Sequence, residues 1–98
     1  MKKIAAKELQ KKLENGEDVS IIDVREDDEV AQGMIPGARH IPLGQLSDRM
    51  SEIDKDKQHF MVCRSGGRSG KACSLLEENG FDVTNMKGGM ITWKGSKA

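Results

Sequence analysis

The sequence predicts an α/β fold in which a parallel sheet is covered by helices, and three observations support this prediction. Short apolar runs rich in β-branched residues alternate along the chain with segments of helical periodicity. The connections between them are short and carry turn residues, such as Pro36-Gly37. The 98 residues contain no internal repeat, low-complexity tract or linker. We therefore expect one domain over residues 1–98.

The first half of the chain is expected to contain three helical segments and two strands. Leu9 and Leu13 are four residues apart, which predicts a helix over Lys7–Asn15 that ends at Gly16. The run VSIIDV predicts a strand over Val19–Val24, buried on both faces. The remaining elements here are a short helix over Glu26–Gln32 with acidic residues at its start, a strand over Ala38–Ile41 that Pro42 ends, and a helical segment over Gln45–Ile53.

The second half continues the alternation. QHFMV predicts a strand over Gln58–Val62, and the apolar spacing that follows predicts a helix over Ser69–Asn79, with Gly80 as its C-terminal stop. A last strand is expected over Val83–Met86 and a last helical turn over Ile91–Lys94. In open parallel sheets the reactive positions lie beyond the carboxyl ends of the strands, so we expect a site after Val24 and Val62.

Composition and charge exclude several classes of protein. Sixteen basic and sixteen acidic residues cancel, which gives no support to binding of nucleic acid or anionic membranes. No run approaches the length of apolar sequence that spans a bilayer, and charged residues follow Met1-Lys2-Lys3 at once. Two cysteines are too few for a disulfide scaffold. We expect a cytoplasmic protein with both thiols free.

The loop Cys63–Arg68 (CRSGGR) combines a nucleophile with a cradle for an anion. Cys63 follows a strand and precedes a helix, whose free N–H groups and dipole stabilise a thiolate. Gly66 and Gly67 permit the positive φ angles that let successive backbone amides surround one point. The loop therefore predicts Cys63 as a reactive nucleophile rather than a small hydrophobic core residue.

Arg64 and Arg68 add two permanent positive charges beside that sulfur. The twenty residues from Lys57 to Leu76 contain no carboxylate, so the field around Cys63 is locally positive. These arginines are candidates for binding an anionic substrate. They are also candidates for structural ion pairs, with Asp23 or Glu26 as partners, and the sequence leaves both roles open.

The loop resembles the active-site loop of the rhodanese-like sulfurtransferases. Three further motifs carry the resemblance over most of the chain. They are Asp23-Val24-Arg25-Glu26, the segment Gly33–Pro42 (GMIPGARHIP), and Gly88-Gly89-Met90 followed by Trp93. Two departures from the family pattern are Met34, where His is common, and His40, where Asn is common. Neither falls in the loop, so we expect the chemistry of the loop to be unaffected.

The resemblance implies a five-stranded parallel sheet with helices on both faces, and the activity of a thiosulfate sulfurtransferase. Cys63 would carry the sulfane sulfur of thiosulfate as a persulfide and pass it to cyanide, a thiol or a protein acceptor. The loop residues Arg64, Ser65, Gly66, Gly67 and Arg68 would bind the substrate and stabilise the persulfide. Asp23 and Arg25 would support the site. The resemblance implies no cofactor and suggests a monomer.

Two other functions remain open on the sequence. Cysteine phosphatases also use a thiolate in an amide loop that an arginine closes, but with five residues between Cys and Arg, where this loop has four. A shorter loop suits one sulfur atom better than a tetrahedral phosphate, which disfavours a phosphatase. Reduction of arsenate is disfavoured to a similar degree. A partner-binding module without catalysis is disfavoured because Cys63 is present.

The remaining cysteine and the histidines have simpler interpretations. Cys73 lies on the apolar side of its predicted helix, so we expect a buried core residue rather than a thiol that resolves the persulfide. His40 and His59 lack the paired spacing of metal ligands, so we expect hydrogen-bonded histidines and no metal site.

Overall fold

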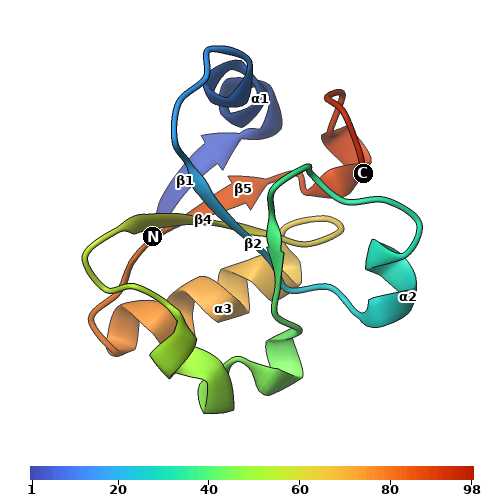
Figure 1. Ribbon diagram of the computed structural model, residues 1–98. Helices are drawn as coiled ribbons and strands as arrows, with labels where there is room; N and C mark the ends of the chain where they lie inside the picture. The colour runs from blue at the N-terminus through green and yellow to red at the C-terminus, as the bar shows by residue number, and fades with distance from the viewer.

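The computed structural model describes residues 1–98 as a five-stranded sheet with helices on both sides (Figure 1). The strands are β1 (Lys2–Ala5), β2 (Ser20–Asp23), β3 (Arg39–His40), β4 (Gln58–Val62) and β5 (Asp82–Lys87). The α-helices are α1 (Ala6–Glu14), α2 (Asp27–Val30) and α3 (Gly67–Glu78). Three 3-10 segments complete the fold: η1 (Leu43–Gln45), η2 (Ser47–Glu52) and η3 (Met90–Thr92).

All strand pairs are parallel, and the strand order is β1-β5-β4-β2-β3. The predicted α/β class with a parallel sheet is therefore confirmed. The central strand β4 pairs with β2 in a register that sets Val62 beside Asp23. The residues that follow both strands consequently emerge at the same edge of the sheet, as the parallel arrangement requires.

The alternation of side chains along β4 divides the core into two layers. Phe60 and Val62 face the layer that α1 and the C-terminal segment cover, whereas Met61 and Cys63 face the layer under α3. Figure 1 shows α1 and α3 on opposite sides of the sheet. Cys63 thus points to the same side as the helix that follows it, with its sulfur at that helix's N-terminus.

Strand β1 was absent from the elements expected on residue pattern, although the family resemblance implied a fifth strand. Two lysines begin it, and of its four residues only Ile4 is buried. It is an edge strand that pairs with β5 alone. An edge strand with exposed lysines lacks the apolar run that marks a buried strand, so its pairing depends on the tertiary fold.

Other elements differ in detail from the prediction: α2 covers Asp27–Val30 rather than Glu26–Gln32, and the last helical turn is a 3-10 segment over Met90–Thr92. The segment expected to be helical over Gln45–Ile53 forms two consecutive 3-10 segments, which still place Leu46 and Ile53 in the core. Helix α3 begins at Gly67, two residues before the expected start. None of the helices has the length and apolar character needed to cross a lipid bilayer.

Candidate active site

The cysteine of the loop lies at the base of a tight turn between β4 and α3. Cys63 is only 1% exposed. Gly66, the residue just before the helix, has φ = 107°, which is a conformation that residues with a Cβ rarely adopt. This left-handed residue turns the chain so that the start of α3 faces back toward the sulfur. The position predicted for Cys63 from the strand–loop–helix pattern is the position that it occupies.

The Cys63 sulfur lies beside groups that are able to donate a hydrogen bond to it. The Gly66 amide donates to Sγ at 3.0 Å, and the Ser69 hydroxyl lies 3.2 Å from it. Burial is the largest single influence and on its own would raise the pKa of the Cys63 thiol. The Ser69 side chain and the amides of the loop outweigh burial together, so this pKa lies below its ordinary value. The arrangement can hold a thiolate away from bulk water.

The segment after β5 holds the loop from the other side. The Met90 amide donates to the Cys63 carbonyl at 2.9 Å, and the Ile91 amide donates to the Arg64 carbonyl at 3.1 Å. Gly89 makes this approach possible: it has φ = 60°, and a Cβ at this position would overlap the Arg64 carbonyl group. Two backbone segments far apart in sequence therefore pack directly against each other at the active-site loop.

Arg68 forms a paired hydrogen bond with a carboxylate of α2. Its two terminal nitrogens donate to the two oxygens of Glu29 at 2.6 and 2.7 Å. Of the two roles left open for Arg68, the structure therefore shows the ion pair, but its partner is Glu29 and not the candidates Asp23 or Glu26. The hydrogen bond from Arg68 lowers the pKa of Glu29 to about 2, and Glu29 in turn raises the pKa of Arg68. Glu29 also accepts the Glu26 amide at 3.0 Å, so α2 holds this carboxylate in place.

Arg64 differs from Arg68 because its guanidinium forms no ion pair, and the residue is exposed. Of the two roles left open for Arg64, the structure shows no ion pair with the candidate partners Asp23 and Glu26. Arg64 lines a surface hollow of about 420 Å³ beside the loop, and Lys97, Asp28 and Glu29 are among the other residues that line it. Ser65 and Gly67 are also exposed, whereas Gly66 is partly covered. The loop therefore offers one free cationic side chain to an incoming anion.

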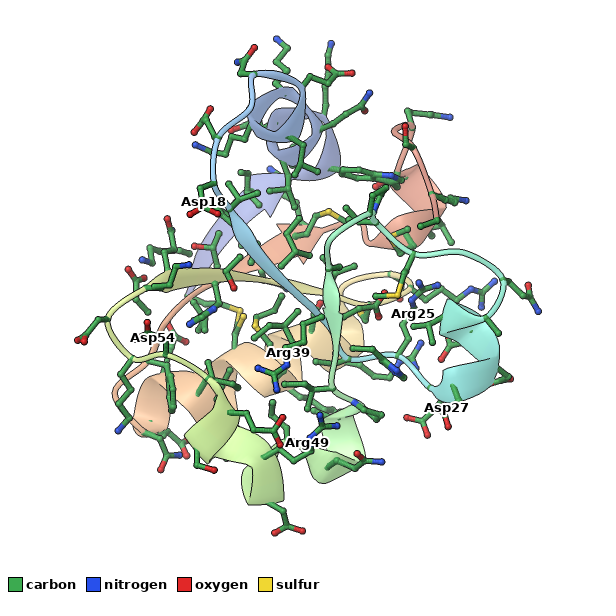
Figure 2. All side chains as sticks on the ribbon, in the orientation of Figure 1. Asp18, Arg25, Asp27, Arg39, Arg49 and Asp54 are labelled. Carbon is green, nitrogen blue, oxygen red and sulfur yellow. The ribbon has the colours of Figure 1, made fainter.

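Asp23 and Arg25 form a buried pair of their own behind the loop. Arg25 Nε lies 3.0 Å from both carboxylate oxygens of Asp23, and Nη2 lies 2.8 Å from Oδ2. The same Nη2 donates to the Gly33 carbonyl at 2.9 Å. Figure 2 shows Arg25 close to α2. The pair fastens the end of β2 to the connection after α2, and so fixes the helix that carries Glu29.

Comparison with known proteins identifies the family. Residues 5–96 match the profile of the family described as "Rhodanese-like domain". The chain belongs to this family. This rhodanese-like domain is 47% identical to the protein YtwF of Bacillus subtilis, over 97% of this chain and 92% of the relative. It is 44% identical to a sulfurtransferase of Allochromatium vinosum, over 92% and 85%.

A solved structure and a further relative agree with this assignment. A rhodanese-like domain protein from Staphylococcus aureus superimposes with a TM-score of 0.93 at 41% identity, over 98% of this chain and 94% of the other. A thiosulfate sulfurtransferase of Pseudomonas aeruginosa, GlpE, is 32% identical over 94% and 83% of the two chains. The relatives support a sulfurtransferase kind of reaction for this rhodanese-like domain.

The second cysteine of this rhodanese-like domain has a different environment. Cys73 has no exposed surface and lies on the side of α3 that packs into the core. Burial raises the pKa of Cys73 to about 12, and the nearby Glu77 acts in the same direction. Both histidines are hydrogen-bonded: His40 Nε2 lies 2.6 Å from the Arg25 carbonyl oxygen, and His59 contacts Ser20 and Asp54.

Residue pattern did not point to two polar residues near the Cys63 sulfur. Ser69, in the first turn of α3, is 0% exposed, and Asn85, on β5, is 6% exposed. The Ser69 hydroxyl donates to Asn85 Oδ1 at 2.5 Å, and Asn85 Nδ2 donates to the Gly66 carbonyl at 3.1 Å. The available signal was an asparagine inside a strand predicted to be buried, where asparagine is depleted unless its hydrogen bonds are satisfied.

Proposed function

We propose that this protein transfers sulfane sulfur from thiosulfate to a thiophilic acceptor through a persulfide on Cys63. The observation that carries this proposal is the Cys63 sulfur, which accepts the Gly66 amide at 3.0 Å inside a six-residue loop at the N-terminus of α3. Such a cradle favours the thiolate, which is the nucleophilic form of cysteine. It is also small enough to suit one additional sulfur atom.

In the first step the Cys63 thiolate attacks the outer sulfur of thiosulfate. A bond forms between Sγ and this sulfur, and the bond between the two sulfur atoms of thiosulfate breaks. Sulfite leaves with the electron pair of that bond, and the enzyme keeps a persulfide anion. The charges balance: a thiolate and thiosulfate dianion become a persulfide anion and sulfite dianion.

In the second step an acceptor attacks the outer sulfur of the persulfide. The bond between this sulfur and Sγ breaks, and Cys63 leaves as a thiolate. Cyanide gives thiocyanate, and a thiolate gives a new persulfide. The amides between Arg64 and Arg68 stabilise the persulfide anion as the amides of an oxyanion hole stabilise oxygen. No cofactor is needed for either step.

The two arginines of the loop have different parts in this proposal. Arg64 is exposed and carries no ion pair, so it attracts the anionic donor and contacts its sulfonate. Arg68 has both terminal nitrogens on Glu29, so it positions the end of the loop rather than binding the donor. Asp23 and Arg25 support the site indirectly, through the connection that follows α2.

The proposed setting is a cytoplasmic monomer with a small anionic sulfur donor and a thiol or protein acceptor. Both cysteines are free in the structure, which fits a reducing compartment. The balanced net charge gives no reason to expect a nucleic-acid partner.

Intact mass after treatment with thiosulfate tests the proposal. The protein should gain the mass of one sulfur atom, and cyanide should remove it and release thiocyanate. Cys63→Ser should gain nothing, whereas Cys73→Ala should gain the same mass as the natural chain. Absence of the added sulfur, or Cys63-dependent turnover of an aryl phosphate or arsenate instead, would overturn the proposed reaction. Partner binding without any turnover would favour a docking module.

A further inference from the structure

A buried chain of hydrogen bonds connects the nucleophile to β5. Cys63 Sγ lies 3.2 Å from Ser69 Oγ, and Ser69 Oγ lies 2.5 Å from Asn85 Oδ1. Asn85 Nδ2 lies 3.1 Å from the Gly66 carbonyl oxygen, which closes the chain onto the loop itself. The side chains of Ser69 and Asn85 are nearly or fully buried. Ser69 and Asn85 therefore take their hydrogen-bond partners from the protein rather than from solvent.

The direction of each hydrogen bond follows from the Gly66 carbonyl. A carbonyl oxygen only accepts, so the amide nitrogen of Asn85 must face it and the amide oxygen must face Ser69. That amide oxygen also only accepts, so the Ser69 hydroxyl must donate its single proton to Asn85. The Ser69 oxygen is then free to accept the S–H proton of Cys63 in its thiol form.

Ionisation of Cys63 changes which groups donate and which accept hydrogen bonds in this chain. The thiolate has no proton to donate, and it faces an oxygen lone pair unless the Ser69 hydroxyl rotates toward it. Rotation stabilises the thiolate with a charge-assisted hydrogen bond but leaves the buried oxygen of Asn85 without its donor. The single proton of Ser69 cannot satisfy both acceptors.

We propose that Asn85 is a positioning residue that competes with the Cys63 thiolate for the hydroxyl proton of Ser69, and so limits how easily Cys63 ionises. Ser69, which contacts the reacting sulfur, favours the thiolate. Asn85 acts through Ser69 and opposes it. The two residues are adjacent in one hydrogen-bonded chain, yet their removal should shift the ionisation of Cys63 in opposite directions.

The competition has a consequence for catalysis that rests on the proposed function. In the persulfide the negative charge lies on the outer sulfur, and Sγ carries neither charge nor proton. The Ser69 hydroxyl then returns to Asn85. When the acceptor removes the outer sulfur, Cys63 leaves as a thiolate and the hydroxyl turns back to Sγ. The hydroxyl therefore stabilises the leaving group of the second step, when charge develops on Sγ.

Other charged groups near the loop also influence the ionisation of Cys63, and none of them is altered in the variants of the test. The charged and titratable side chains of the elements around Cys63 are Arg64 and Arg68 in the loop and its helix, Glu26 and Glu29 at α2, Asp23 at the end of β2 and Arg25 after it, His40 on β3, Lys71 on α3, and Lys87 on β5. Because every variant keeps these groups, differences between variants report the hydrogen-bonded chain.

The rate at which iodoacetamide alkylates Cys63, measured against pH and located by peptide mass, tests Ser69. Ser69→Ala should move the midpoint of the profile to higher pH. Below the midpoint the rate should fall about threefold, because a tenfold loss of thiolate is partly offset by the greater nucleophilicity of a more basic thiolate. Ser74→Ala makes the same chemical change on an exposed position of α3 and should leave the profile unchanged.

The same measurement on Asn85 separates competition from general damage. Asn85→Leu, which removes the acceptor at similar size, should move the midpoint to lower pH and raise the rate below it about twofold. Asn85→Ala removes the same acceptor with a smaller side chain, which cannot clash with its neighbours. It should shift the midpoint in the same direction. Thr84→Val is the control on the same strand, because Thr84 is buried but hydrogen-bonds to Gln58. Thermal unfolding establishes that each variant is folded.

The double variant of Ser69→Ala and Asn85→Leu decides the mechanism. With no hydroxyl to compete for, Asn85→Leu should leave the midpoint of Ser69→Ala unchanged. The proposal would be overturned if the midpoint moved to higher pH in both Asn85 variants, or if it did not move. It would also be overturned if Asn85→Leu lowered the midpoint as much in the Ser69→Ala background as in the natural chain. Alkylation requires no sulfur transfer, so these results stand apart from the outcome of the thiosulfate experiment.

Discussion

Two cysteines ten residues apart have nearly the same burial and opposite acidity. Cys63 is 1% exposed and Cys73 is fully buried. The pKa of Cys63 lies below its ordinary value, because hydrogen bonds from Ser69 and the loop amides outweigh burial. The pKa of Cys73 is raised to about 12, because burial meets no donor to offset it. Burial by itself therefore does not decide whether a cysteine is reactive.

The difference comes from where each cysteine lies along α3. Cys63 precedes the helix and faces its free amides, while Cys73 lies in the middle, where the amides are already bonded within the helix. A helix thus stabilises an anion at its N-terminus and gives none of this stabilisation to a thiol packed against its side. The same helix consequently lies beside one acidic thiol and one thiol that only packs in the core.

The largest expected effect is on the activity of the two cysteine variants. Cys63→Ser should abolish release of thiocyanate from thiosulfate and cyanide, because it removes the nucleophile. Cys73→Ala should keep activity within about tenfold, since it removes only core packing, at a cost of about 1–2 kcal/mol in the free energy of unfolding. Steady-state assays and thermal unfolding measure both. A larger loss in Cys73→Ala would mean that this thiol takes part in the reaction.

The next largest effect should come from distorting the loop Cys63–Arg68 while leaving both cysteines in place. Gly89→Ala puts a Cβ into the Arg64 carbonyl at a residue with φ = 60°, so the loop must shift. Activity should fall about a hundredfold, as expected when reacting groups are misplaced by about 1 Å. The alkylation midpoint of Cys63 should move toward that of an ordinary thiol.

Gly37→Ala is the matched control for this substitution. Gly37 also has a positive φ, of 81°, but a Cβ there would meet nothing within 4 Å. It should cost about 1 kcal/mol in stability through backbone strain and leave activity and the alkylation profile unchanged. Equal losses of activity in the two variants would contradict the role assigned to the contact of Gly89 with the loop.

A smaller effect should appear in stability at alkaline pH. The folded protein keeps the Cys73 proton up to about pH 12, whereas the unfolded chain loses it near the ordinary thiol pKa of about 8.5. The unfolded state then binds fewer protons, so the free energy of unfolding falls as pH rises through this window. Relative to Cys73→Ala, the natural chain should lose about 2 kcal/mol by about pH 10, measured by urea unfolding. Parallel curves would show that Cys73 ionises normally.

The smallest effect concerns the ion pair that anchors the loop. Glu29→Gln should reduce activity about threefold, because Arg68 no longer holds the end of the loop against α2. The folded pKa of Glu29 is about 2 against about 4.3 unfolded, so its stabilisation is present above pH 4.3 and is lost as pH falls toward 2. For this partly exposed pair we expect about 1 kcal/mol.

Glu52→Gln provides the comparison for Glu29. Glu52 pairs with Arg49 on η2, away from the loop, and the hydrogen bond from Arg49 lowers its pKa as well. Figure 2 labels Arg49 beside the 3-10 segments. The variant should leave activity unchanged. An activity loss in Glu52→Gln as large as in Glu29→Gln would point to a general electrostatic effect rather than to the anchoring of Arg68.

Local pattern predicted most of the fold and the nucleophile. Apolar runs and helical spacing identified β2, β4, β5, α1 and α3, because burial and periodicity leave a direct trace in residue type. Cys63 lies between a strand and a helix and is followed by Gly66, and this pattern identified the loop whose amides surround the sulfur. The family resemblance supplied the fifth strand, since the exposed lysines of β1 conceal it from residue pattern.

Pairing between distant residues was decided only by the tertiary structure. Arg68 is paired with Glu29 rather than with Asp23 or Glu26, because α2 packs at the same edge of the sheet and its first turn holds that carboxylate. Asn85 reaches Ser69 because β5 lies beside β4 and faces α3. The sequence by itself thus determined which residue could be a nucleophile, through local backbone geometry. The tertiary structure determined which donors and counter-ions surround it, because those groups come from separate elements that meet only on folding.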